Sequence, residues 1–422
     1  MTAHLKPLAL QSLCGYSYST DSINAALPLE EVSRDNESIQ LPPGFPDFIQ
    51  EISLQSNTIT PHVVELGEDD IDEIETSLHA FKGLEMNGDD VNRERFPLPG
   101  LEKRLDQCAL ETHFGPGLCV IKGLDPRNYS IEDNMIIFLG ISSYLGGMRG
   151  IQGINRSMGT MITHVTDFKA WTVPKDRRHG IHTNHYLPFH NDMGCDILAI
   201  QVRECAQTGG RTCVVPFSAV YNELAVSNPQ VLQVLARSDW PVRTSPKRYI
   251  LSPLLEYHEG NLMVSMDPAR IGPHASSKGF IPPLTLEQEM ALAVVQEVAN
   301  KHQLRLDQQA GDLVYLNNWG LLHAREAYQD GESSSRHLIR LWLRNEALGW
   351  SIPASMQDPW DCSFGHKAKK VVNHDYPIIP MPKYVESKYS SGTAAFVRED
   401  DDEDDDANDT QTGTSGQEEK KL

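Results

Sequence analysis

The chain has 422 residues, of which 40% are hydrophobic and 23% are charged, and its formal net charge is −21. This composition supports a sizeable packed core, and its acidic balance excludes the basic surface typical of proteins that bind nucleic acid. No apolar run is long enough to predict a helix that spans a membrane.

The first third of the chain predicts two helices and one strand. Residues 1–45 form an irregular extension in this interpretation, and they lead into the turn-rich segment 42–46, which contains three prolines and a glycine. Apolar residues recur at helical spacing over 69–86, and acids crowd the first turn of that segment. An apolar run bounded by glycine predicts a strand at 117–121, and 131–145 predicts a second helix.

Short strands and helices alternate through the rest of the chain. We predict strands at 197–202, 212–215, 313–316 and 338–343, a helical segment at 217–237 with a new helix starting at Pro229, and a helix over 286–298 whose capping box is Thr285 with Gln288. This pattern is typical of a mainly β fold, a jelly-roll barrel with helical additions. We expect one domain over 46–385, followed by a disordered acidic tail over 386–422.

Cysteine usage indicates a cytoplasmic protein. The seven cysteines include no CxxC pair and their number is odd, which favours reduced thiols. Residues 1–30 lack the apolar core of a signal peptide. The sequence thus predicts neither nucleic-acid nor membrane partners, and it contains no signal for an oligomeric state.

His190 and Asp192 are two residues apart, so both side chains can point the same way from a strand. His323, which follows a predicted strand and turn, can supply a third ligand to the same metal. Two imidazoles and one carboxylate form the facial triad of non-heme Fe(II) oxygenases, which leaves coordination positions open. His182 and His185 lie nearby, so a three-histidine zinc or cupin-type site stays an alternative. We expect the ligands at the mouth of the barrel, outside the packed core.

Arg336 and Arg340 follow His323 and are four residues apart, so they share one face of a strand about 13 Å apart. A guanidinium pairs bidentately with a carboxylate in a way that lysine cannot reproduce. One arginine can therefore hold a carboxylate beside the metal while the other contacts substrate. Two surface arginines are the alternative interpretation, and Arg325 is the next candidate for binding the carboxylate.

Four motifs together resemble the TauD/TfdA family of Fe(II)/2-oxoglutarate-dependent dioxygenases, in particular its clavaminate synthase-like branch. They occur in the family's order and are Phe-His-Asn-Asp-Met-Gly-Cys-Asp at 189–196, Gly-Gly-Arg-Thr at 209–212, Asn-Asn-Trp…His-Ala-Arg at 317–325 and Arg-His-Leu-Ile-Arg at 336–340. The resemblance covers roughly residues 60–350. It implies a double-stranded β-helix (jelly-roll) core.

The resemblance also implies roles for six residues. The implied Fe(II) ligands are His190, Asp192 and His323; the implied 2-oxoglutarate-binding residues are Arg336 and Thr212; and Arg340 is implied to hold an anionic group of the substrate. The implied reaction consumes O2 and 2-oxoglutarate, releases succinate and CO2, and hydroxylates a small, anionic organic molecule or natural-product intermediate. Desaturation and ring closure remain open outcomes.

Two other functions remain open at this point. One is a non-catalytic jelly-roll protein that uses the barrel for binding and the acidic tail for interaction. The other is a hydroxylase that acts on a peptide or protein, for which the acidic charge would favour basic partners.

Overall fold

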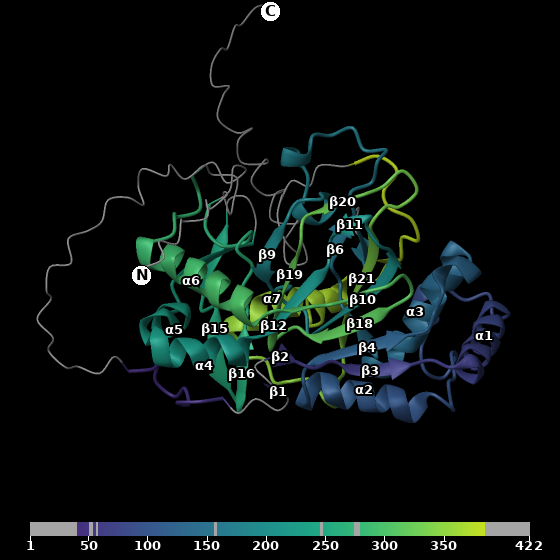
Figure 1. The fold of residues 1–422 in the computed structure, drawn as a ribbon, viewed down its shortest axis with the longest axis horizontal. Coiled ribbons are helices and arrows are strands. Elements are labelled where there is room, and N and C mark those ends of the chain that lie inside the picture. Colours follow the sequence, from purple (N-terminus) through teal and green to yellow (C-terminus); the bar gives the residue numbers. More distant parts are fainter. Residues whose placement is uncertain are drawn as a thin grey trace, which may run out of the picture.

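The computed structural model describes residues 40–49, 54–55, 58–155, 158–244, 248–273 and 279–384. Most of the predicted N-terminal extension and the predicted acidic tail lie outside the described residues. The described part forms four layers, with two sheets in the middle and one group of helices on each outer side (Figure 1).

The larger of the two central sheets has seven strands. Its strands are β3 (His62–Glu65), β4 (Leu118–Lys122), β18 (Leu313–Asn317), β10 (Ile197–Glu204), β21 (His337–Arg344) and β5 (Met148–Arg149) in spatial order, with β8 (Ile162–Thr166) also paired to β21. All of these pairings are antiparallel except that of β3 with β4.

The second central sheet has four strands and carries the histidine ligands predicted from the sequence. In spatial order they are β17 (Leu304–Arg305), β12 (Thr212–Pro216), β19 (Leu321–Arg325) and β9 (Leu187–His190). The antiparallel pairing of β19 with β9 places His323 directly opposite His190. Residues far apart in the chain therefore meet through strand register alone.

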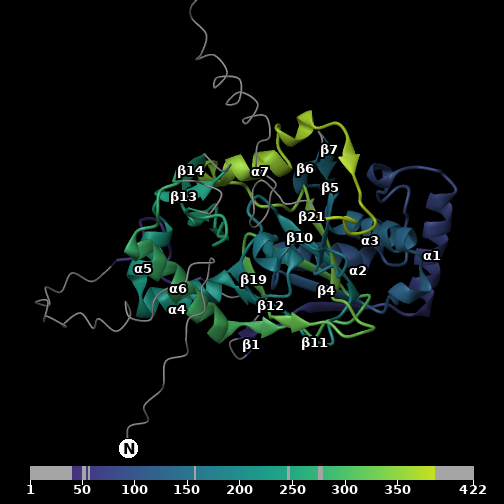
Figure 2. The same ribbon diagram turned by 90° about the horizontal axis from the view of Figure 1, so that it is seen from above.

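Helices cover the outer face of each sheet, as both ribbon views show (Figures 1 and 2). The outer face of the seven-stranded sheet packs against α1 (Glu68–Lys82), α2 (Glu102–Phe114) and α3 (Ile131–Leu145). The outer face of the four-stranded sheet packs against α4 (Phe217–Ser227), α5 (Pro229–Leu235) and α6 (Leu286–His302). A short helix, α7 (Gln357–Ser363), follows β21.

Paired short strands complete the described structure. They are β1 (Leu54–Gln55) with β2 (Thr58–Ile59), β11 (Thr208–Gly209) with β20 (Tyr328–Gln329), β13 (Trp240–Arg243) with β14 (Tyr249–Ser252), β15 (Leu255–His258) with β16 (Asn261–Val264), and β7 (Met158–Thr160) with β6 (Gly153–Asn155) and β22 (His374–Asp375).

Alternation along the strands sorts side chains between the layers, because successive residues point to opposite faces of a sheet. In β18, Leu313 and Tyr315 pack against the α1–α3 group, whereas Val314 and Leu316 join the cluster between the sheets. In β19, Leu322 and Ala324 pack toward the α4–α6 group. The residues between and after them therefore point into the space between the two sheets.

Most elements predicted from the sequence are present. The helix predicted at 131–145 has the bounds of α3, and α6 begins at the capping box of Thr285 and Gln288. The predicted break at Pro229 separates α4 from α5. The helix α2 and the β13–β16 hairpins are not among the predicted elements. Across the part of the chain that the structure describes, no helix combines the length and apolarity needed to cross a bilayer.

Candidate metal centre

Three side chains predicted as metal ligands come together between the sheets. One ligand atom from each of His190, Asp192 and His323 lies within 4.8 Å of the others. His190 ends β9, His323 lies opposite it on β19, and Asp192 follows β9 by two residues. The two imidazole ring centroids are 4.2 Å apart. The strand pairing therefore places the two histidines side by side and Asp192 next to them.

The carboxylate of Asp192 is held by one oxygen and leaves the other toward the histidines. Its Oδ2 accepts a hydrogen bond from Trp342 Nε1 at 2.8 Å and forms an ion pair with Arg340 Nη1 at 3.0 Å. Its Oδ1 lies 4.0 Å from His323 Nε2. Burial opposes ionisation of this carboxyl, but the charge of Arg340 reverses that effect and lowers its pKa. Asp192 is thus an anion with one oxygen available to a metal.

The two histidines are also suited to metal binding. The Nδ1 atom of His190 lies 2.8 Å from the carbonyl oxygen of Pro188, a contact that leaves Nε2 free to act as a ligand. Burial, with a contribution from the neighbouring His190, lowers the pKa of His323 to about 3. A neutral imidazole is the form that coordinates metals.

Two asparagines fix the loop that carries Asp192. The side chain of Asn318 accepts a hydrogen bond from the Asp192 backbone N–H and donates to the carbonyls of Asp192 and Cys195. The side chain of Asn191 bonds to the backbone of Val264 and Met266. Asn191 and Asn318 belong to two different sequence motifs, at 189–196 and 317–325. Only the fold shows that both orient the loop that carries Asp192.

The expected position of the ligands at a barrel mouth is wrong for Asp192. Its side chain is only 1% exposed, and it lies in the packed space between the sheets. The reason is Arg340, which projects from β21 of the opposite sheet and supplies the positive charge that a buried carboxylate needs. Arg340 Nε also donates to Gln152 Oε1 at 2.8 Å.

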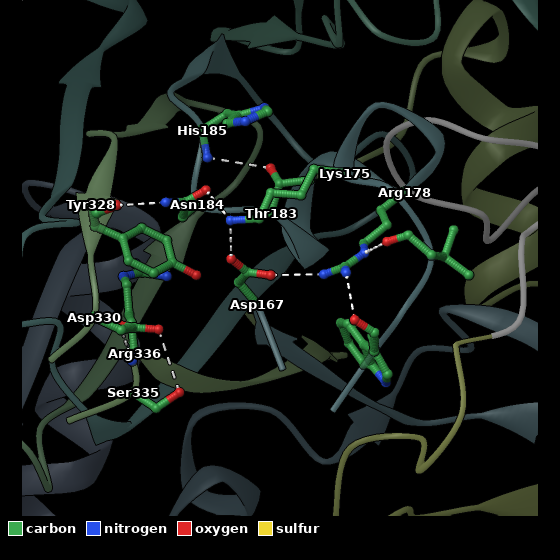
Figure 3. Close-up of polar contacts among 12 residues, drawn as sticks. Asp167, Lys175, Arg178, Thr183, Asn184, His185, Tyr328, Asp330, Ser335 and Arg336 are labelled. Atoms are coloured by element: carbon green, nitrogen blue, oxygen red, sulfur yellow. Dashed lines mark hydrogen bonds and ion pairs between the residues drawn. The ribbon is translucent and has the colours of Figure 1, made fainter. Parts of the chain in front are cut away.

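A second cluster consists of Arg325, Tyr328 and Arg336, and we call it the arginine cluster. The guanidinium carbons of Arg325 and Arg336 lie 5.2 and 5.4 Å from the centroid of the Tyr328 ring. Figure 3 shows Arg336 beside the Tyr328 ring. In the loop before β9, the side-chain amide of Asn184 donates a hydrogen bond to the backbone carbonyl of Tyr328. All three side chains are buried.

Several polar atoms of this cluster have no hydrogen-bond partner among the residues that the structure describes. They are Arg336 Nη1, Arg325 Nε and Nη1, and Tyr328 Oη. Burial lowers the pKa of Arg336 to about 10 and that of Arg325 to about 9, so both remain cationic at neutral pH. Buried donors without partners are rare in folded proteins, and here they indicate a binding site for an anionic ligand.

Arg336 reaches its position by crossing from one sheet toward the other. Its Nε donates to the carbonyl of Gly210 at 2.8 Å, and its backbone N–H donates to Asp330 Oδ1. Gly210 has a φ of +73°, and a Cβ at this position would lie 2.8 Å from Arg336 Cδ. The Gly-Gly part of the sequence motif therefore makes room for the arginine.

Thr212 lies beside the arginine cluster, opposite Arg325 in the pairing of β12 with β19. Its backbone N–H donates to Gln308 Oε1 at 3.3 Å. The structure thus brings Thr212, Arg325 and Arg336 into one region and the three metal-ligand candidates into another. Arg340 contacts Asp192 of the second group.

The residues present fit an Fe(II) ion and an anionic co-substrate. Two nitrogen donors and one carboxylate oxygen are the facial triad of non-heme Fe(II) sites. The unpartnered donors of the arginine cluster match the distal carboxylate of a dicarboxylic acid such as 2-oxoglutarate.

Comparison with known proteins agrees with this chemistry. Residues 83–342 match the family model described as taurine catabolism dioxygenase TauD, TfdA family. The chain belongs to the TauD/TfdA family. The prediction of a non-heme Fe(II)/2-oxoglutarate-dependent dioxygenase is therefore confirmed, and Fe(II), 2-oxoglutarate and O2 are its cofactor and co-substrates.

Three known proteins are similar to this chain over more than half of its length. The taurine hydroxylase-like protein SAT17 of Stachybotrys chartarum is 32% identical over 317 residues, which cover 72% of this chain and 80% of that protein. The FR-33289 synthase of Streptomyces rubellomurinus is 25% identical over 281 residues, 63% of this chain and 80% of that protein. An asparagine oxygenase solved with Fe(II), hydroxyasparagine and succinate shares the fold, with a TM-score of 0.53 at 16% identity over 68% of this chain and 98% of its own.

Proposed function

We propose that this TauD/TfdA enzyme hydroxylates a C–H bond of a small organic molecule, with Fe(II) held by His190, Asp192 and His323. The observation that carries the proposal is the cluster of three ligand atoms within 4.8 Å, together with the one free oxygen of Asp192. When bound, Fe(II) supplies the activation of O2 that links decarboxylation of 2-oxoglutarate to oxidation of substrate.

The protein's own residues prepare the site before any substrate arrives. Arg340 and Trp342 fix one oxygen of Asp192, so the other keeps its direction toward the histidines. Arg336, beside Thr212, binds the distal carboxylate of 2-oxoglutarate through its unpartnered Nη1. The guanidinium fork makes this recognition directional, which orients the co-substrate toward the metal.

The proposed substrate is a small anionic molecule or a natural-product intermediate. Support for the class comes from the relatives, one called taurine hydroxylase-like and the other an FR-33289 synthase. Arg340 is the sequence-based candidate for holding the anion; its Nη1 forms an ion pair with Asp192, and its contact with substrate stays a prediction. Arg270 is a further buried cation of this region: burial lowers its pKa to about 9, so it remains charged at neutral pH.

The proposal also includes the fold of the core and the location of the protein in the cell. We take the two facing sheets as the halves of a jelly-roll core within an oxygenase domain over 46–385, since both sheets contribute to one inner hydrophobic cluster. We also infer a cytoplasmic location from the thiols, because five described cysteines form no disulfide: Cys108, Cys119, Cys195, Cys205 and Cys213.

The test is a measurement of succinate release from 2-oxoglutarate by the Fe(II)-loaded protein, alone and with a panel of small anionic compounds. We expect slow release without substrate and faster release with a substrate, accompanied by a hydroxylated product. An Asp192→Ala variant serves as the control that lacks the metal ligand. Equal succinate release by the wild type and this variant would contradict the metal assignment.

A further inference from the structure

The unpartnered donors of the arginine cluster come from Arg325 and Tyr328 as well as from Arg336. We propose that Arg325 is a second residue that binds the distal carboxylate of 2-oxoglutarate, together with Arg336 and the Tyr328 hydroxyl. The inference rests on the proposed function, because it assumes that 2-oxoglutarate occupies this pocket. It assigns to Arg325 a role in co-substrate selection.

The position of Arg325 on its strand puts it within reach of the co-substrate. Arg325 is two residues after His323 on β19, so both side chains leave the same face of the sheet about 7 Å apart. A five-carbon dicarboxylic acid that meets the metal at one end has its other end at a comparable distance. Thr212 lies opposite Arg325 on the same face.

Only part of the Arg325 guanidinium is used by the protein. Its Nη2 donates to the carbonyls of Gly180 and His185 in the loop that precedes β9. Its Nε and Nη1 are buried and have no partner in the described part of the chain, and the same holds for Arg336 Nη1 and the Tyr328 hydroxyl. These four atoms come from three side chains around one aromatic ring. One carboxylate has about four acceptor positions, which matches this number of donors.

Charge also calls for an anion at this position. Arg325 and Arg336 are both buried, and a guanidinium stays protonated at neutral pH, so two positive charges lie close together in this pocket. Within the described residues, the hydrogen bonds of the two guanidinium groups go to the carbonyl oxygens of Gly180, His185 and Gly210, which carry no full charge. Two neighbouring buried cations favour a ligand that is negatively charged at its distal end.

The experiment compares two ligands that differ only at the distal end. Binding of 2-oxoglutarate and of 2-oxopentanoate, which carries a methyl group in place of the distal carboxylate, is measured by calorimetry on protein loaded with Mn(II), which does not turn over. In the wild type we expect a large preference for 2-oxoglutarate. In Arg325→Met we expect 2-oxoglutarate to bind roughly tenfold to a hundredfold more weakly, with 2-oxopentanoate almost unchanged.

The ratio of the two affinities separates ligand binding from a purely structural role. If Arg325 only supports the 180–185 loop, its removal lowers the affinities for 2-oxoglutarate and 2-oxopentanoate by the same factor, and the inference is overturned. Arg325→Lys keeps the charge and is the second variant if Arg325→Met unfolds; we expect it to lose part of the preference. Arg211→Met is the matched control, because Arg211 forms an exposed ion pair with Glu326 next to the pocket.

A parallel Arg336→Met measurement distinguishes the inference from the proposed function. If Arg336→Met loses the preference and Arg325→Met keeps it, only the role of Arg325 is wrong. If the wild type itself shows no preference for 2-oxoglutarate, the proposed function fails. Succinate retains the distal carboxylate, so we also expect it to inhibit Arg325→Met at least several-fold more weakly than the wild type.

Discussion

The metal-ligand cluster and the arginine cluster differ in how completely the protein satisfies them. Around Asp192, the second carboxylate oxygen, the backbone N–H and the backbone carbonyl all have protein partners. Around Tyr328, four buried donor atoms have no partner within the described residues. The first region is held in place by the protein, whereas we propose that a ligand completes the second. Unpartnered buried polar atoms therefore point to a ligand site more directly than a sequence motif does.

The largest expected effect is that of Asp192→Ala. We expect succinate release to fall to background, because the metal loses its only carboxylate ligand. We also expect the melting temperature to fall, since removing one partner of a buried ion pair costs about 3–5 kcal/mol. Activity and thermal unfolding are the measurements. In Asp192→Ala/Arg340→Met both charges are gone, so it should recover stability without activity; a single variant as stable as the wild type would contradict the buried ion pair.

Arg336→Lys tests the region that the protein leaves incomplete. The charge remains, but the planar fork is lost together with the bond to Gly210. We expect the affinity for 2-oxoglutarate to fall by about 1.5–3 kcal/mol, roughly tenfold to a hundredfold. Calorimetric titration of the Mn(II) protein measures this, with Arg211→Lys as control. An unchanged affinity would remove Arg336 from the co-substrate site.

Gly210→Ala is a smaller change to the same region. The added Cβ would lie 2.8 Å from Arg336 Cδ at a residue whose φ is +73°, so Arg336 or the turn has to shift. We expect a loss of stability of about 1 kcal/mol and a several-fold higher KM for 2-oxoglutarate, with little change in kcat. Gly260→Ala is the matched control, because its φ is also positive but nothing lies within 4 Å of the added Cβ. Equal KM changes in both variants would show that strain alone, and not Arg336, is responsible.

The smallest expected effect concerns a buried pair that is satisfied without a ligand. His164 Nδ1 lies 2.8 Å from His337 Nε2, and His164 Nε2 lies 2.8 Å from the carbonyl of Pro377. Burial is the main cause that lowers the pKa of His164 to about 4 and that of His337 to about 3. Both imidazoles are thus neutral in the folded protein at neutral pH.

The sign of the pH effect follows from these shifts. The folded state binds fewer protons than the unfolded state, so stability is present above pH 6.5 and is lost as the pH falls toward 4. Between pH 7.5 and pH 6 we expect a loss of less than about 1 kcal/mol per histidine, independent of 2-oxoglutarate. Denaturant unfolding of the wild type and His337→Leu measures it, with the exposed His79→Leu as control. An equal pH slope in all three proteins would refute the assignment.

Local patterns in the sequence predict the helices and the candidate residues, but not their contacts across the fold. The capping box of Thr285 and the motif of His190 and Asp192 are readable because they are contiguous. The ion pair of Arg340 with Asp192 is not, because it depends on how β21 of one sheet faces the loop after β9. Arg325 is visible in the sequence, yet its free nitrogens appear only when the strands are paired.

The pairing of β9 with β19 has a consequence for how the protein is assembled. His190 and His323 are neighbours across one strand pair, although about 130 residues of chain separate them. Closing so long a loop costs conformational entropy before any ligand can bridge its ends. A metal ion bound by both histidines would hold the two ends of that loop together and stabilise the folded state. Removal of the metal by a chelator should therefore destabilise the four-stranded sheet first.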